Sequence, residues 1–486
     1  MPLSLGRLIA DDAPHLHGVD QISISGLTSD SRAVKPGFLF AALPGTSVDG
    51  AKFIPQAIAS GAAAVLAQKG VTVEGVPHIE VDNPRLIFAR MAARFFGSQP
   101  DLVVAVTGTN GKTSVASFVR EIWGNMGFRA ASLGTIGVVS PSGTVGLQHT
   151  TPDPVRLHEI MAALATDHVQ HLAIEASSHG LDQYRLHGLR VTAGAFTNIT
   201  RDHLDYHPDF EDYFNAKMRL FEELLQPGSP AVVNADSPQA TDVLNRAKKR
   251  GLVPFTVGRS GSALELRNVT RDGFGQRLDV QGPTKRHAIL LPLVGDFQTS
   301  NALVAAGLVI ATGGEEVLAM HGLETLKGAK GRLELVGYAK GSAPVFVDYA
   351  HTPDALENAI ISLRPYVKGK LAVVFGCGGD RDKGKRPQMG AIATRLADVS
   401  YVTDDNPRTE DPAKIRRDIM AAAPGAVEIG GRAAAVRTAV EDLRAGDILL
   451  VAGKGHEEGQ KIGNQELPFS DHDAVRAAIA GEDYHG

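Results

Sequence analysis

The sequence feature that most constrains the fold is a glycine-rich segment at residues 107–113, TGTNGKT. A short apolar run at 102–106 precedes it, and a helix-like stretch at 114–126 follows it. Short apolar runs that are rich in β-branched residues and end at glycines are typical of buried parallel strands. We therefore predict a strand, a tight loop and a helix in immediate succession, as at the start of an α/β fold.

The predicted loop is suited to bind phosphate. Glycines let backbone N–H groups turn inward around phosphate oxygens, and the N-terminus of the following helix adds partial positive charge. Lys112 can neutralise β/γ-phosphate charge, and the Thr113 hydroxyl can ligate Mg²⁺. The strict pattern G-x-x-x-x-G-K-[ST] is not met, because its first position is Val106; the shorter G-x-x-G-K-T stands instead. The alternative is an ordinary turn between a strand and a helix.

Strands and helices alternate along the rest of the chain. The alternation predicts a doubly wound, mainly parallel sheet. Between 263 and 293 the apolar pattern has period two, which indicates an antiparallel excursion. A second α/β unit begins near Arg332. The strands expected are 171–176, 193–198 and 231–234 in the first unit and 345–347, 371–375, 399–402 and 448–452 in the second, with helices at 352–363 and 415–422.

The chain divides into three regions, as its 486 residues suggest at roughly 150 residues per domain. Residues 1–99 mix short strands and turns with a helix from about 86 to 96. The segment Gly97-Ser98-Gln99-Pro100 has the composition of a linker. We predict a small mixed α/β domain at 1–99, a central domain at 100–331 that holds the phosphate loop, and a third domain at 332–486.

Composition excludes several classes of protein. The chain has 49 Lys and Arg against 54 Asp and Glu, a net charge of −5, whereas nucleic-acid binders usually carry a basic excess. A single cysteine, Cys377, excludes intrachain disulfides and any multi-cysteine metal site. No window reaches the ~18 apolar residues of a membrane span, and the N-terminus has no signal pattern. We expect a cytoplasmic protein with no nucleic-acid partner and no membrane insertion.

Two further strand ends carry polar residues that could hold a metal. Glu175 ends the apolar run 171–176, and His203 lies in the polar segment 197–207 that follows the next strand. In open α/β sheets, the carboxyl ends of the strands face the ligand crevice. Either side chain alone is more often a structural residue that is capped or hydrogen-bonded. Because both occur in one unit with a phosphate loop, a metal-binding role and a structural role both stay open.

Lys217 lies in the helix-like stretch 210–225, with Phe214, Met218 and Phe221 on nearby turns. The residues alone favour a surface lysine whose aliphatic stem covers an apolar face. Cys377 follows an expected buried strand, and we expect a structural role for it rather than a catalytic one.

Nine motifs follow one another along nearly the whole chain. They are GTNGKTS at 108–114, HTTPDP at 149–154, EASSHGLDQYR at 175–185, TNITRDHLDYH at 197–207, GRLELV at 331–336, VDYAHTPDAL at 347–356, FGCGGDRDKGKRP at 375–387, TDDNPRTEDP at 403–412 and GKGHE at 453–457. With these motifs in this order, the sequence resembles a known family, the Mur ligases.

The resemblance implies a UDP-binding N-terminal domain, a central ATPase domain and a Rossmann-like C-terminal domain. It also implies the chemistry: ATP phosphorylates the D-glutamate carboxylate of UDP-N-acetylmuramoyl-L-alanyl-D-glutamate, and the amine of meso-diaminopimelate attacks the acyl phosphate. The product is a UDP-linked muramoyl tripeptide for peptidoglycan, made in the cytoplasm by a monomeric enzyme with ATP and Mg²⁺. Phosphorylation makes physical sense because a carboxylate is a poor electrophile, and Mg²⁺ and Lys112 would stabilise the charge on the transferring oxygens.

Roles follow for individual residues from the same resemblance. Lys217 matches the family's carbamylated lysine, which reverses the interpretation as a surface residue. The catalytic set would be Lys112, Glu175, His203 and Lys217, and Mg²⁺ would be arranged by Thr113, Glu175, His203 and Lys217. The nucleotide would be held by Gly108, Thr109, Asn110, Gly111, Lys112, Thr113 and Ser114, with Asn301, Arg332 and Asp348. The UDP-muramoyl dipeptide would be bound by Ser31, Thr150, Thr151, Ser177, Gln183 and Arg185. Asn301 could instead cap a helix, and Asp348 could merely begin a turn.

The resemblance also points to the amino acid that is added. The diaminopimelate-type motif of the family, DNPR, is matched by Asp405, Asn406, Pro407 and Arg408. The planar guanidinium group of its arginine suits the second carboxylate of diaminopimelate. Relatives that add L-lysine lack this arginine. The remaining contacts would come from Arg381, Gly453 and Glu457. The same four letters occur at 82–85, where Asn or Asp before Pro is typical of a helix start, so only the second copy is predicted to be functional.

Three other functions compete with this interpretation. A folylpolyglutamate-synthetase-like enzyme would share the phosphate loop but not the UDP-type N-terminal domain or the DNPR motif. A P-loop NTPase whose hydrolysis drives a conformational switch would turn over ATP without acceptors. A catalytically inactive scaffold that binds nucleotide sugars would not need Lys112, Glu175, His203 and Lys217 together.

Overall fold

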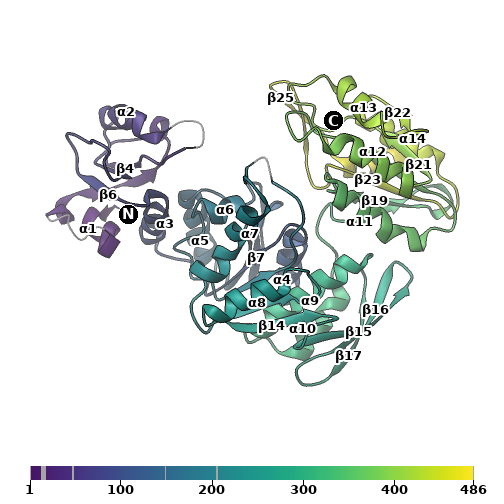
Figure 1. The fold of residues 1–486 in the computed structure, drawn as a ribbon, viewed down its shortest axis with the longest axis horizontal. Coiled ribbons are helices and arrows are strands. Elements are labelled where there is room, and N and C mark those ends of the chain that lie inside the picture. Colours follow the sequence, from purple (N-terminus) through teal and green to yellow (C-terminus); the bar gives the residue numbers. More distant parts are fainter. Residues whose placement is uncertain (1, 13–17, 46–48, 148, 204–205, 485–486) are drawn as a thin grey trace.

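The computed structural model describes residues 2–12, 18–45, 49–147, 149–203 and 206–484. Leu204 and Asp205 of the predicted polar segment therefore lie outside the described residues. Three sheet-based parts follow one another along the chain, with the N-terminal part at one end of the molecule and the C-terminal part at the other (Figure 1). This confirms the predicted α/β class with three domains. The boundaries after residues 99 and 331 stay predictions.

The N-terminal part contains a four-stranded parallel sheet with the order β3-β4-β5-β6. Its long helix, α3, begins where the sequence indicates, because Asn83 caps it by accepting a hydrogen bond from the Leu86 N–H and Pro84 occupies the first turn. α3 packs against α5 of the central part. The elements are β1 (Leu3–Ser4), α1 (Leu5–Ile9), β2 (Ser23–Ile24), β3 (Gly26–Thr28), β4 (Phe38–Ala41), α2 (Ile54–Ala59), β5 (Ala64–Gln68), β6 (His78–Val81) and α3 (Pro84–Phe96).

The central part is built on an eleven-stranded sheet, β10-β9-β8-β11-β7-β12-β13-β14-β15-β16-β17. Its middle strands are parallel, and β15, β16 and β17 form the antiparallel excursion predicted for 263–293. The strands are β7 (Leu102–Thr107), β8 (Ala130–Gly134), β9 (Gly137–Ser140), β10 (Gly143–Val145), β11 (His171–Glu175), β12 (Ala193–Phe196), β13 (Pro230–Asn234), β14 (Val253–Gly258), β15 (Leu264–Asp272), β16 (Gly275–Gln281) and β17 (Arg286–Leu291).

Helices cover both faces of this sheet, so its central strands are buried on both sides. One core joins the sheet to α4 and α9, and the other joins it to α5, α7 and α8. The burial explains why these strands are continuous apolar runs rather than alternating ones. The helices are α4 (Lys112–Asn125), α5 (Pro154–Thr166), α6 (Ser178–Asp182), α7 (Phe210–Arg219), α8 (Ala240–Lys249), α9 (Asp296–Ala311) and α10 (Glu316–Gly322).

The C-terminal part has a six-stranded sheet with the order β18-β19-β23-β20-β21-β22, in which only the β18–β19 pair is antiparallel. Arg432 and Asp471 form an ion pair beneath it, and both side chains are fully buried. The elements are β18 (Glu334–Tyr338), β19 (Pro344–Asp348), α11 (Pro353–Leu363), β20 (Leu371–Phe375), α12 (Lys385–Leu396), β21 (Val399–Val402), α13 (Pro412–Met420), β22 (Val427–Glu428), α14 (Arg432–Asp442), β23 (Ile448–Ala452), β24 (Gly459–Ile462), β25 (Gln465–Pro468) and α15 (Asp471–Ala480).

The parallel strands place the predicted polar residues at one edge of the central sheet. β7, β11, β12 and β13 end at Thr107, Glu175, Phe196 and Asn234, and the phosphate loop leaves β7 at this edge. Among the described residues, no helix is long and apolar enough to cross a membrane.

Candidate active site

The loop between β7 and α4 depends on its two glycines. Gly108 and Gly111 have φ values of 146° and 88°, which residues other than glycine rarely adopt. A Cβ on Gly108 would lie 2.0 Å from Thr197 Oγ1, and one on Gly111 would lie 2.2 Å from Asn301 Oδ1. The backbone of the loop is therefore packed directly against two neighbouring elements, at the N-terminus of a 14-residue helix.

The segment that follows β12 holds this loop in place. Thr109 N–H donates to the Asn198 carbonyl at 2.8 Å, and Asn110 N–H donates to Asn198 Oδ1 at 3.0 Å. Thr197 Oγ1 donates to the Asn110 carbonyl at 2.6 Å. Sequence analysis assigned no role to Thr197 or Asn198, although both lie at the carboxyl end of a predicted strand.

Lys112 lies against the loop from within the first turn of α4. Its Nζ donates to the carbonyls of Gly108 at 2.9 Å and Thr109 at 2.7 Å. Burial lowers the pKa of Lys112, while the carboxylates of Glu175 and Asp202 oppose that shift. The ammonium is therefore at the loop, where it can contact a bound phosphate.

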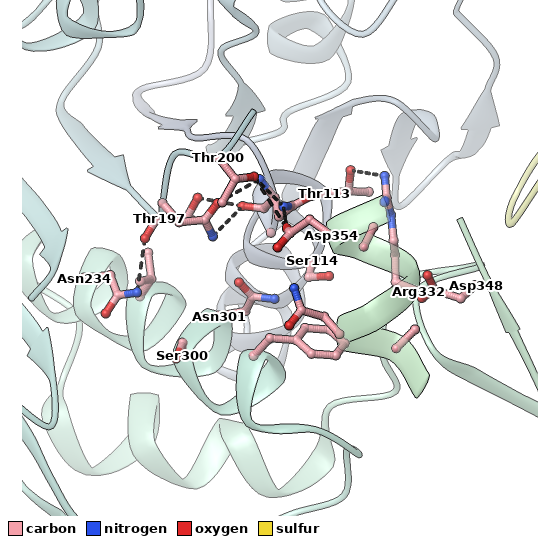
Figure 2. A pocket seen from close by; sticks show the side chains of 18 residues that line it. Thr113, Ser114, Thr197, Thr200, Asn234, Ser300, Asn301, Arg332, Asp348 and Asp354 are labelled. Carbon is pink, nitrogen blue, oxygen red and sulfur yellow. Dashed lines mark hydrogen bonds between the residues drawn. The ribbon is translucent and has the colours of Figure 1, made fainter. Parts of the chain in front are cut away.

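A cavity of about 290 Å³ opens beside the loop, between α9, α11 and the start of the C-terminal part (Figure 2). Arg332 reaches across it, and its Nη2 donates to Thr113 Oγ1 at 3.2 Å. The predicted residues that line it are Asn110, Gly111, Thr113, Ser114, Asn301, Arg332 and Asp348, and those not singled out from the sequence include Asn198, Asn234, Phe297, Ser300 and Asn358.

The alternative roles of Asn301 and Asp348 have different outcomes. Asn301 lies inside α9 rather than at its start, so the helix-cap interpretation is wrong. Asp348 does organise a turn, because its carboxylate accepts from Leu333 N–H at 2.6 Å and Ala350 N–H at 2.8 Å. It also lines the cavity, and burial raises its pKa to about 6.

Thr113 and Glu175 supply the oxygen atoms that a hard cation needs. Thr113 Oγ1 donates to Glu175 Oε2 at 3.1 Å, and Glu175 also accepts from Thr135 N–H at 2.8 Å and Thr135 Oγ1 at 3.1 Å. Within the described residues, no three His, Cys, Asp or Glu side chains form a metal-binding group. Mg²⁺ commonly takes one or two protein oxygens together with phosphates and water, so this donor set fits it.

His203 lies in a larger cleft of about 960 Å³ that adjoins the first cavity. Its ring is 4.9 Å from that of His179, and its Nε2 is 3.5 Å from Asp202 Oδ2. Thr200 and Asp354 line both hollows, so the cleft and the loop-side cavity share a wall.

Lys217 is buried, with 1% of its surface exposed, so the surface interpretation drawn from the residues alone is wrong. Its Nζ donates to the Gly108 carbonyl at 2.8 Å and lies 4.3 Å from the centre of the Tyr213 ring. Burial, together with repulsion from Lys112, lowers the pKa of Lys217 well below that of a free lysine. Lys217 lies in α7, which continues directly into a π-helical turn, Leu220–Leu224.

Four of the residues predicted to bind the muramoyl peptide, Thr151, Ser177, Gln183 and Arg185, are joined by hydrogen bonds, and Thr150 is bonded to Thr135 instead. Thr135 and Thr150 share a hydrogen bond of 3.1 Å, and Thr151 and Ser177 share one of 2.9 Å. Arg185 donates to the Thr151 carbonyl and to Gln183 Oε1, both at 2.8 Å. Ser31 lies elsewhere, in the N-terminal part, where it is buried and its hydroxyl donates to Gln56 at 3.3 Å.

The opposite wall of the large cleft comes from the C-terminal part. The predicted residues Arg381, Asp405, Asn406, Arg408, Gly453 and Glu457 all line it. Arg408 has a φ of 51°, and its Nη1 donates to the Gly379 carbonyl at 2.8 Å. Pro407 is not among the residues that line the cleft, and its carbonyl oxygen packs closely against Gly379, where an added Cβ would lie 1.9 Å away.

The other DNPR copy, at 82–85, has the structural role that the sequence indicated. Asn83 caps α3, and Arg85 donates to the Pro44 carbonyl at 2.6 Å. Asp82 forms an exposed ion pair with Lys69. The two copies therefore occupy different environments despite their identical letters.

The cavity beside the phosphate loop shares a wall with a cleft that is lined by arginines and carboxylates. This arrangement suits an enzyme that couples nucleotide cleavage to the joining of an acid and an amine. Models of three Mur ligase domains match the chain: the Mur ligase family catalytic domain at residues 23–96, the Mur ligase middle domain at 106–309 and the Mur ligase glutamate ligase domain at 331–455. The chain belongs to the Mur ligase family.

Near full-length relatives are named UDP-N-acetylmuramoyl-L-alanyl-D-glutamate–2,6-diaminopimelate ligase. The one from Bradyrhizobium diazoefficiens is 54% identical over 98% of this chain and 99% of its own length. The one from Mesorhizobium japonicum is 56% identical over 94% and 95%. A solved structure of a ligase with the same name has a TM-score of 0.72 at 31% identity and covers 99% of both chains.

We predict that Gly111→Ala blocks nucleotide binding without unfolding the protein. The added Cβ would collide with Asn301 and force an unfavourable φ, which moves the loop N–H groups. Calorimetric titration with ADP checks this, with an expected loss of affinity of about 100-fold or more. Gly124→Ala in the same helix is the control, because nothing lies within 4 Å of its added Cβ. Unchanged ADP affinity in Gly111→Ala would contradict the role of the loop.

Proposed function

We propose that the chain is the ATP-dependent ligase that adds meso-diaminopimelate to UDP-N-acetylmuramoyl-L-alanyl-D-glutamate through an acyl phosphate. The observation that carries the proposal is the shared wall of Thr200 and Asp354, which joins the cavity at the phosphate loop to the cleft of Arg408 and Glu457. A phosphoryl donor in the cavity and an amine in the cleft would then meet at one carboxylate.

In this proposal the phosphate loop positions ATP for attack by the D-glutamate carboxylate. The loop N–H groups and the start of α4 would bind the phosphates, and Lys112 and Arg332 would balance the negative charge that builds on the transferring oxygens. Asn301, Asp348 and the cavity residues would hold the rest of the nucleotide. Fixed donors and bound reactants together lower the barrier, because little reorganisation remains.

Mg²⁺ fits the oxygens of Thr113 and Glu175, and His203 would complete its surroundings from the cleft. When bound, the cation supplies charge neutralisation at the phosphates. The chain's own part is to keep the Glu175 carboxylate oriented, which the hydrogen bonds from Thr113 and Thr135 support.

Lys217 is proposed to carry a carbamate. Carbamylation requires a neutral amine, which attacks CO₂, forms an N–C bond and loses one proton. The lowered pKa of Lys217 supports this, because burial and the nearby Lys112 ammonium both favour the neutral amine. The product would be an anion close to the Lys112 ammonium, which would turn a repulsive pair into an attractive one, and its oxygens would be able to help hold Mg²⁺.

The cleft is proposed to read both ends of diaminopimelate. The Arg408 and Arg381 guanidinium groups suit the carboxylate of its distal amino-acid head, and the Glu457 carboxylate suits an ammonium. Thr150, Thr151, Ser177, Gln183 and Arg185 would hold the muramoyl dipeptide, and Ser31 would contact its uridine end. The cytoplasmic location and the monomeric state stay predictions.

Phosphate release from ATP tests the function. With UDP-N-acetylmuramoyl-L-alanyl-D-glutamate present, we expect phosphate release to require meso-diaminopimelate. L-lysine should be a poor substitute for it. Release with L-lysine instead would overturn the assignment of Arg408 but keep the ligase. Release that needs neither acceptor would favour the switch-type NTPase, and binding of the nucleotide sugar without any release would favour the scaffold.

We predict that Lys217→Ala lowers the ligation rate by about 100-fold or more and that millimolar formate or acetate restores part of it, because the small anion takes the place of the carbamate. The control is Lys249→Ala, an exposed lysine on the neighbouring helix α8, which should neither lose activity nor respond to acetate. Full activity of Lys217→Ala without an added carboxylate would exclude the carbamate.

We predict that Arg408→Ala raises the KM for meso-diaminopimelate by about 10- to 100-fold, the range of a charge-assisted bidentate contact. The KM for ATP should change by less than about twofold, since Arg408 lines the cleft and not the nucleotide cavity. Arg85→Ala, in the first DNPR copy, serves as the matched control for the KM of diaminopimelate. An unchanged KM in Arg408→Ala would contradict the proposed contact.

A further inference from the structure

Lys454 lies directly after β23, between the predicted contacts Gly453 and Glu457, and has no assigned role. Its side chain is 0% exposed. It does not line the large cleft, whereas Asp405, Asn406, Gly453 and Glu457 around it do. A lysine that is fully buried is rare in proteins unless its charge is paired.

The Lys454 ammonium is paired with groups that all belong to the proposed amino-acid site. Its Nζ donates to Asn406 Oδ1 at 3.0 Å and to Glu457 Oε2 at 2.9 Å. Asp405 Oδ1 lies 3.9 Å away from the same Nζ. One buried cation therefore joins the DNPR segment to the loop that carries Glu457.

These contacts determine which way the Asn406 amide faces. Its Oδ1 accepts from Lys454 Nζ and also from Lys461 N–H, the latter at 3.0 Å. Its Nδ2 is then directed at Glu457, where it donates to Oε2 at 2.8 Å. A flipped amide would place its NH₂ group against two donors, so Lys454 excludes that orientation.

The same contacts determine which oxygen of Glu457 is available. Lys454 Nζ and Asn406 Nδ2 both donate to Oε2, so Oε1 is the oxygen available to a ligand in the cleft. The charges also matter, because the Lys454 ammonium partly offsets the Asp405 and Glu457 carboxylates. The free Oε1 of Glu457 is then the group placed to accept a hydrogen bond from a substrate ammonium.

We propose that Lys454 is a positioning residue for the acceptor amino acid: it orients the Asn406 amide and Glu457 so that a single ammonium of the acceptor is bound. The inference rests on the proposed function of the cleft. Lys454 itself touches no substrate and acts through Asn406 and Glu457.

The test is steady-state kinetics of Lys454→Met with each substrate varied in turn. We expect the KM for meso-diaminopimelate to rise about 10-fold or more while the KM for ATP stays within about twofold, because the nucleotide cavity contains none of the groups that Lys454 contacts. Lys461→Met is the matched control, since its exposed side chain pairs with Glu466 at 3.7 Å and its backbone N–H to Asn406 is kept. An unchanged KM for diaminopimelate, or an equal rise for all substrates, would overturn the proposal.

A double-mutant cycle with Glu457→Gln distinguishes positioning from general support of the fold. If Lys454 acts through Glu457, adding Lys454→Met to Glu457→Gln should change the KM for diaminopimelate by less than about threefold. Equal factors in both backgrounds would overturn the proposal. In the double variant neither position 454 nor position 457 carries a charge, so neither leaves the other as an unpaired buried charge. If Lys454→Met alone does not fold, the comparison of the double variant with Glu457→Gln still separates positioning from support of the fold.

The wild-type enzyme separates this inference from the proposed function. Wild-type phosphate release that requires meso-diaminopimelate supports the function whatever the variants do. Release that does not require it rejects the function, and with it the acceptor that Lys454 is proposed to position.

Discussion

The carbonyl oxygen of Gly108 accepts hydrogen bonds from two lysines, Lys112 at 2.9 Å and Lys217 at 2.8 Å. Lys217 is buried and Lys112 is half-buried, so water screens the repulsion between their charges only in part. This repulsion adds to burial in lowering the pKa of Lys217 well below the usual range. The phosphate loop thus brings together the two lysines that the proposed function uses, Lys112 as a phosphate contact and Lys217 as the site of a carbamate.

The same loop connects the central and C-terminal parts of the chain. Asn110 Nδ2 donates to Asp354 Oδ2 at 3.3 Å, and Arg332 donates to Thr113. Because Asp354 lines both the cavity beside the phosphate loop and the larger cleft, a ligand in one hollow would lie against the wall of the other. A ligase needs this geometry, since its activated carboxylate must meet the amine before water does.

The parts of the site that follow one strand could be predicted from the sequence. The strand, loop and helix around 107–113 depend on local glycines and an apolar run, and Glu175 is located by the rule for the carboxyl ends of parallel strands. Asn234 ends β13 and could have been found by the same rule. Strands β8 and β14 were not predicted, because β8 is rich in Ala and Gly and β14 contains Pro254.

Other parts depend on contacts between distant segments, which a single sequence does not reveal. The burial of Lys217 requires the packing of α7 and its π-helical turn against the central sheet. Phe297 and Asn358 reach the cavity from two helices that meet only in the folded chain. The sequence around Lys454 is a glycine-rich loop and does not indicate that its side chain is buried against Asn406 of the DNPR segment. The roles of Arg408 and Ser31 rested on family resemblance rather than on spacing.

The central claim is that ATP cleavage activates a carboxylate of the substrate. Isotope transfer tests it most directly: UDP-N-acetylmuramoyl-L-alanyl-D-glutamate labelled with ¹⁸O in the reacting carboxylate is turned over with meso-diaminopimelate, and the released phosphate is analysed by mass spectrometry. An acyl phosphate passes one carboxylate oxygen to phosphate when the amine displaces it, so we predict one ¹⁸O atom per phosphate released. Phosphate without the label would mean that water attacks ATP, and it would contradict the ligase mechanism.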